Sequence, residues 1–168
     1  MKLTIYQKSV YRIIINATMI LRSIGKTYKK DPEKLKDFKY KLFKKIEILI
    51  NLMDKEKLKN KKIRQEIKDL ASECNVSVGQ SQKCINVILK YHFLLNYNNP
   101  KVKKELDCPL DSLILKELGV KKIFLNKMNF EKYTDYQNAI ESKLKQNQYK
   151  LDFDDFWDNQ NLKKDGLL

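Results

Sequence analysis

The sequence predicts an all-α fold in a single compact domain that spans all 168 residues. The chain contains only 4 Gly and 3 Pro, which leaves few residues for the tight turns that a multi-stranded sheet requires. Hydrophobic residues make up 42% of the chain and recur at helical spacing. No alternation of apolar and polar residues is long enough to indicate a strand. A chain of this length can bury a substantial core as one domain.

Six helices account for most of the periodic apolar residues. They are predicted over residues 3–28, 31–53, 62–74, 80–96, 109–118 and 130–147. Asp31 is expected to cap the second helix with Pro32 in its first turn, and Gly119 to close the fifth. The connections are expected to be exposed or irregular, except for an aromatic turn over residues 153–162 that packs on the core.

The apolar segment over residues 13–21 follows a basic start, as the apolar region of a signal peptide does. No small-x-small cleavage site follows it, and the segment is too short to span a bilayer. We therefore expect a buried first helix and no association with a membrane.

Positive charge is concentrated in the first part of the chain. The formal net charge is +14, and residues 1–70 contain 20 basic and 8 acidic side chains against 15 and 13 in residues 71–168. Such a field is typical of a polyanion-binding protein, so DNA is the expected partner and RNA is possible. A compositional bias towards lysine from an AT-rich genome is the alternative explanation, and an anionic membrane is a third. Only three basic residues are Arg, which favours binding of phosphates over reading of bases.

The metal-ligating residue types are sparse. Cys74, Cys84 and Cys108 form no CxxC pair, and His92 is the one histidine of the chain. We therefore expect no zinc site and no cofactor, and reduced thiols in a cytoplasmic protein. His92 is expected to be a core or boundary histidine on the far side of its helix from Lys83.

The predicted helix over residues 80–96 is apolar around most of its circumference, which is typical of a buried helix. Lys83, Asn86 and Lys90 nevertheless lie on one narrow stripe at spacings i, i+3 and i+7. Such a stripe is expected to face a cleft, a ligand or a paired charge. Asp111 is a candidate partner, either as the N-cap of the following helix or as a carboxylate of a functional site.

Two segments resemble the helix-hairpin-helix DNA glycosylases, and most closely the 8-oxoguanine type with a lysine nucleophile. They are Val78-Gly79-Gln80-Ser81-Gln82-Lys83, which is similar to the hairpin turn before the nucleophile, and Pro109-Leu110-Asp111. The resemblance covers about residues 76–118 and implies that Lys83 attacks the sugar C1′ and forms a Schiff base. It also implies that Asp111 assists deprotonation and stabilises the developing sugar cation. Such enzymes extrude the target nucleotide from the duplex.

The predicted site thus has Lys83 and Asp111 as catalytic residues and contains no metal. The residues predicted to contact nucleic acid are Gly79, Gln80, Gln82, Asn86, Lys90, Lys101, Lys103, Lys104, Lys41, Lys44 and Lys45. The alternative is a non-catalytic protein that binds nucleic acid or inhibits a nucleic-acid machine.

Two groups of aromatic residues have open interpretations. The acidic segment over residues 152–158 packs on the core through Trp157, folds back on the basic face, caps the last helix or binds a protein partner. Tyr133 and Tyr136 either pack in the core or stack on bases.

Overall fold

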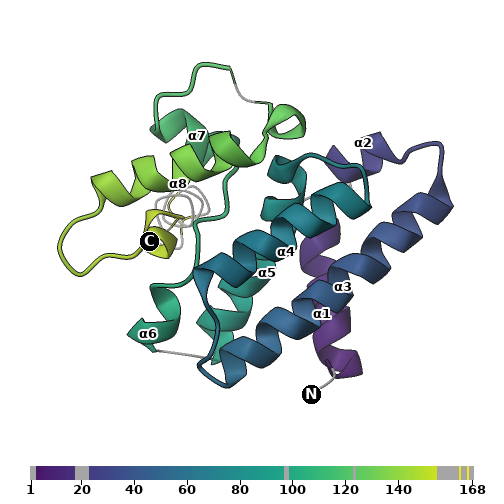
Figure 1. Ribbon diagram of the computed structural model, residues 1–168, viewed down its shortest axis with the longest axis horizontal. Helices are drawn as coiled ribbons and strands as arrows, with labels where there is room; N and C mark the ends of the chain where they lie inside the picture. The colour runs from purple at the N-terminus through teal and green to yellow at the C-terminus, as the bar shows by residue number, and fades with distance from the viewer. Residues whose placement is uncertain are drawn as a thin grey trace.

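The computed structural model describes residues 3–17, 23–96, 99–122 and 124–154, together with Lys163 and Gly166. All regular structure in these residues is helical, which confirms the predicted all-α class (Figure 1). The α-helices are α1 (Ile5–Ile15), α2 (Gly25–Thr27), α3 (Pro32–Asp54), α4 (Asn60–Glu73), α5 (Val78–Asn96), α6 (Pro100–Lys103), α7 (Ser112–Glu117) and α8 (Phe130–Lys143). There are also two 3-10 helices: η2 (Leu125–Lys127) lies between α7 and α8, and η3 (Lys150–Asp154) follows α8.

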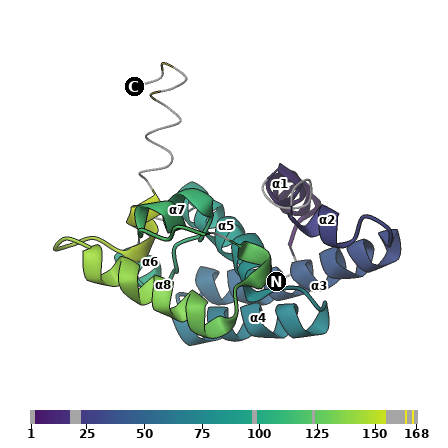
Figure 2. The same ribbon diagram turned by 90° about the horizontal axis from the view of Figure 1, so that it is seen from above.

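Helix α5 is the central element of the fold. It packs against α1, α3 and α4 on one side, and against η2 and α8 on another (Figures 1 and 2). One contiguous apolar cluster runs through these helices, from Tyr11 in α1 to Ile140 in α8. No helix of the described residues is both long and apolar enough to cross a membrane.

Capping side chains set the helix ends close to the predicted positions. Asp31 accepts a hydrogen bond from the backbone N–H of Lys34 (3.0 Å) at the start of α3, and Pro32 is its first residue. Gly119 ends α7 with a φ of +81°, a conformation that glycine adopts without strain. The predicted loop before Asp111 contains one helical turn, α6, which Asn99 caps. Phe156 and Trp157 lie outside the described residues.

His92 occupies the interior position that the sequence predicts, and it is 3% exposed. Its Nδ1 atom lies 2.6 Å from the hydroxyl oxygen of Tyr11, and its Nε2 atom lies 3.1 Å from Asp54 Oδ1. Burial and the charge of Asp54 raise the pKa of Tyr11 to about 12, so its hydroxyl stays protonated. The imidazole therefore ties α1, α3 and α5 together.

The turn between α4 and α5 differs from the predicted glycine turn. It consists of residues 74–77, in which Asn75 has a left-handed φ of +48°, and Gly79 already belongs to the first turn of α5. Ser77 and Gln80 explain the earlier start, because each side chain accepts a hydrogen bond from the other's backbone N–H (both 3.0 Å). This capping box was not recognised in the sequence.

Gly79 has a packing role instead. A Cβ atom at this position would lie 2.2 Å from the backbone oxygen of Leu125 and 2.8 Å from Met128 Cβ. The backbone N–H of Gly79 also donates to the carbonyl of Met128 (3.3 Å). The missing side chain thus allows η2 to lie directly against the start of α5.

We predict that Gly79→Ala destabilises the protein by about 1–3 kcal/mol, because either α5 or η2 must move to accommodate the methyl group. Urea unfolding measures the change. Gly119→Ala is the comparison, since its new methyl group enters open space and only the left-handed φ costs about 1 kcal/mol. A loss below about 0.5 kcal/mol for Gly79→Ala would contradict the close packing.

Candidate active site

Lys83 and Asp111 meet in the structure, although 28 positions separate them in the sequence. Lys83 projects from the second turn of α5, and its Nζ atom lies 2.9 Å from Asp111 Oδ2. The side chains are 12% and 18% exposed, so both are largely withdrawn from solvent without being sealed. The structure therefore brings together the two residues that the sequence predicts to be catalytic.

Asp111 is the N-cap of α7, which is one of the two roles that the sequence left open, and it also contacts Lys83. Its Oδ1 atom accepts hydrogen bonds from the backbone N–H groups of Leu113 (2.9 Å) and Ile114 (3.0 Å), which caps α7. Its Oδ2 atom contacts Lys83. Because the cap uses one oxygen, the carboxylate is fixed in orientation while the other oxygen is directed at the amine.

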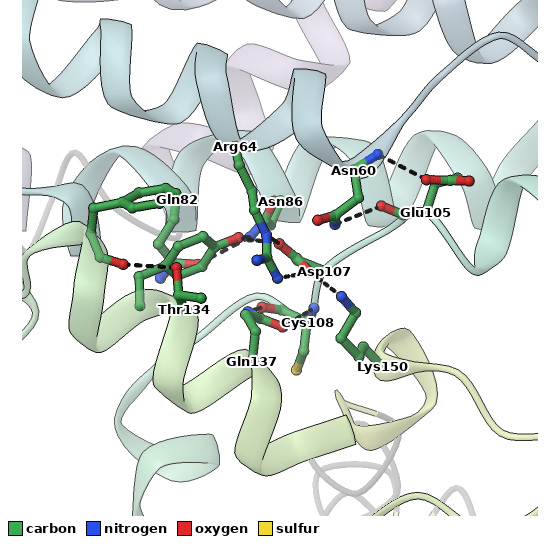
Figure 3. A network of polar contacts seen from close by, with 12 residues as sticks. Asn60, Arg64, Gln82, Asn86, Glu105, Asp107, Cys108, Thr134, Gln137 and Lys150 are labelled. Carbon is green, nitrogen blue, oxygen red and sulfur yellow. Dashed lines mark hydrogen bonds and ion pairs between the residues drawn. The ribbon is translucent and has the colours of Figure 1, made fainter. Parts of the chain in front are cut away.

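The chain before Asp111 is extended and buried, and two glutamines hold it in place. Gln82 in α5 accepts from the backbone N–H of Leu110 (3.1 Å) and donates to its carbonyl (2.7 Å). Gln137 in α8 does the same for Cys108 (3.1 and 2.7 Å). Figure 3 shows the glutamine of α8 directed at Cys108. These side chains replace the neighbouring strand that an extended segment would otherwise need.

Asp107 anchors the other end of this segment, and its side chain is completely buried. Arg64 of α4 donates to both carboxylate oxygens (2.8 and 3.1 Å), and Lys150 pairs with Oδ1 (Figure 3). The Tyr133 hydroxyl donates to Oδ2 (2.7 Å). Burial alone would raise the pKa of Asp107. The hydrogen bonds and charges of Arg64 and Lys150 outweigh it, so the pKa lies below its usual value.

Tyr133 lies in the core, which was one of the two positions considered for it, and its hydroxyl belongs to the hydrogen-bond network of Asp107. Burial and the neighbouring Asp107 carboxylate raise the pKa of Tyr133 well above its usual value. The hydroxyl also accepts a hydrogen bond from the Asn86 amide (3.1 Å). Tyr136 is partly buried and packs against the core.

The stripe of α5 faces paired charges and this network. Lys90 pairs with Asp154 of η3 at 2.7 Å, and both side chains are less than 10% exposed. Burial raises the pKa of Asp154, and the charge of Lys90 opposes that rise. Asn86 is 2% exposed and also donates to Gln82 (3.2 Å). The stripe was expected to face a cleft, a ligand or a paired charge, and in the structure both of its lysines face a paired aspartate.

Several residues predicted to contact nucleic acid are turned inward and bonded within the protein. This group comprises Gly79, Gln80, Gln82, Asn86, Lys90 and Lys45. Lys45 was expected on the exposed face of its helix, but it pairs with Glu66 (3.3 Å) and Glu73 (2.8 Å) because α4 covers that face. In this conformation these residues position the fold and do not face a ligand in solvent.

The remaining predicted contact residues lie at the surface. Lys44, Lys101 and Lys104 are exposed. Lys41 pairs with Asp37 (2.7 Å) and Lys103 with Asp152, and both lysines keep part of their surface open. These five lysines remain candidates for contacts with phosphate groups.

A comparison of the chain with known protein families, curated proteins and solved structures finds no match. The arrangement of Lys83, Asp111 and the segment that positions them is therefore the basis for inferring a function.

The supporting residues Asp107, Gln137 and Lys150 were not identified from the sequence. Arg64 carried a signal, because it is one of three Arg in a chain with 35 basic residues. A bidentate contact with a buried carboxylate requires the planar guanidinium group, which lysine cannot replace. The other three residues have no local pattern that distinguishes them from surface polar residues.

We predict that Asp107→Asn lowers the free energy of unfolding by about 3–5 kcal/mol at pH 7, because Arg64 and Lys150 keep buried charges without a counter-ion. Since the folded pKa is depressed, the contribution of Asp107 is present above about pH 3.8 and disappears as the pH falls through the folded value. Urea unfolding at a series of pH values should show the two proteins converging in acid. The exposed Asp135→Asn is the matched control, and an equal effect of both variants would contradict the role of Asp107.

Proposed function

We propose that the protein is a DNA N-glycosylase in which Lys83 attacks a damaged or modified nucleotide. The proposal depends above all on the 2.9 Å contact between Lys83 Nζ and Asp111 Oδ2. A lysine attacks only as a free amine, and a carboxylate within hydrogen-bond distance can take its proton.

The reaction needs no partner beyond the substrate and water. Asp111 accepts the proton of Lys83, and the amine nitrogen uses its lone pair to form a bond to C1′. The bond between C1′ and the base breaks, and the base leaves with the bonding electron pair and takes up a proton from water. The bonded nitrogen then loses a proton to water, and its lone pair displaces the ring oxygen from C1′, which takes up a proton. The result is a Schiff base between Lys83 and C1′, which water hydrolyses. Asp111 passes the proton on to water before the bond between C1′ and the base breaks, so its restored negative charge stabilises the cationic sugar as it develops.

The partly buried site requires that the substrate nucleotide leaves the base stack before it reaches Lys83. Binding of the flanking DNA is assigned to exposed lysines such as Lys101 and Lys104. Contacts of this kind engage phosphates and are weakened by salt.

We predict that sodium borohydride traps a covalent complex between the protein and DNA that contains a damaged base or an abasic site. The reductant converts the Schiff base into a stable amine, which gel electrophoresis detects as a shifted band. Lys83→Met abolishes the band because it removes the nucleophile. Lys116→Met, at an exposed position of α7, leaves it intact. If a broad panel of lesions gives no adduct while duplex binding persists, the protein is a non-catalytic binding module.

Asp111→Asn separates the structural role of this residue from its chemical role. Asparagine caps helices about as well as aspartate, so α7 and the thermal stability should be preserved. The amide cannot accept the proton of Lys83, so we predict that single-turnover cleavage slows by about 10²–10⁴-fold. Unchanged cleavage would exclude Asp111 as the base, whereas loss of stability would show that its charge is needed for folding.

A further inference from the structure

A second surface with ligand-binding character lies on α1 and α3, away from Lys83. The two helices cross here (Figure 1), where Lys8 of α1 pairs with Glu47 of α3, and they line a groove of about 520 Å³. Each helix contributes four residues at spacings i, i+3, i+4 and i+7. The lining residues are Ile5, Lys8, Ser9 and Arg12 from α1, and Tyr40, Phe43, Lys44 and Glu47 from α3.

The groove combines exposed apolar surface with positive charge. Ile5 is 87% exposed and Tyr40 is 63% exposed, while Phe43 forms a half-buried part of the lining. Large apolar side chains that adjoin one another at a surface indicate an interaction site more often than isolated ones do. The ammonium group of Lys44 lies 5.5 Å from the centre of the Tyr40 ring, so cation and aromatic surface are offered together.

The charges of the groove have an excess of cations. Glu47 is the acidic lining residue, and it is already engaged by Lys8 Nζ and the backbone N–H of Leu3 (both 3.3 Å). Within the part of the chain that the structure describes, neither Arg12 nor Lys44 has a carboxylate partner. Two exposed cations thus flank an apolar groove in the half of the sequence that holds most of the positive charge.

We infer that this groove binds a short stretch of single-stranded nucleic acid. Unpaired bases expose flat apolar faces that stack on aromatic side chains, and their phosphates pair with lysine and arginine. A duplex keeps its bases stacked inside, so it offers nothing to Tyr40, Phe43 or Ile5. From Ile5 to Arg12 the groove extends about 10 Å along α1, the length of about three stacked nucleotides.

The groove is independent of the proposed chemistry, since none of its residues contacts Lys83 or Asp111. It would hold a strand that is unpaired beside the site of reaction or elsewhere on the same substrate. An acidic amphipathic peptide is the competing ligand, because it too combines apolar groups with negative charge.

The test measures fluorescence anisotropy of a labelled oligothymidylate of ten residues, with the Lys83→Met protein so that no chemistry intervenes. Tyr40→Ala should weaken binding about tenfold through loss of stacking. Two phosphate contacts, through Arg12 and Lys44, predict a slope of about −1.4 for log K against log salt concentration. Arg12→Gln with Lys44→Gln removes both contacts and should bring that slope close to zero. Lys57→Gln with Lys61→Gln, two exposed lysines that do not line the groove, is the charge-matched control.

Three results would overturn the inference. The first is strand binding that neither Tyr40→Ala nor the double variant weakens. The second is a duplex of the same length that binds equally well and is weakened equally by these substitutions. The third is an acidic peptide that binds more tightly than the strand and is the only competitor that displaces it. Strand binding without any borohydride adduct would refute the proposed glycosylase and leave the groove standing. An adduct without strand binding would do the reverse.

Discussion

The buried extended segment over residues 106–110 is the constraint on which the rest of the structure depends. An extended chain in the interior of a helical protein has backbone N–H and C=O groups that no neighbouring strand can satisfy, and each one left unpaired is costly. Gln82 and Gln137 satisfy the backbone of Leu110 and Cys108, while Arg64, Tyr133 and Lys150 satisfy the side chain of Asp107. Elements α4, α5, α8 and η3 thus have to converge on this one segment.

The same constraint positions the candidate site. Gln82 and Lys83 are consecutive residues of α5, so the helix that fixes Leu110 also carries the amine that contacts Asp111. An error in the path of the segment would therefore move Asp111 relative to Lys83 by the same amount. Because the clamp is bidentate and buried, it restrains both translation and rotation of the segment. This restraint keeps a carboxylate in contact with an amine without relying on the weak attraction of a surface ion pair.

The features that the sequence predicted are those that local chemistry determines. Capping residues such as Asp31 and Asp111 marked helix starts, and the contrast between Lys83 and its apolar neighbours indicated a partner. Features that depend on distant residues were missed. Lys45 looked like a surface lysine because its two acidic partners belong to another helix, and Gly79 looked like a turn because η2 approaches it from 46 residues away. Asp107 gave no local signal, since its environment forms only when α4, α8 and η3 meet around it.

The lysines of the chain lie in two different environments, one buried and paired, the other exposed. In the second half of the chain Lys83, Lys90 and Lys150 are withdrawn from solvent and each is matched with an aspartate, so they add almost nothing to the external field. In the first half of the chain, by contrast, Arg12 of α1 and Lys44 of α3 remain exposed. In the proposed function, Lys83 needs an acceptor for its proton, and Asp111 lies within hydrogen-bond distance. A lysine proposed to hold phosphate needs to stay charged and accessible instead, as Lys44 does.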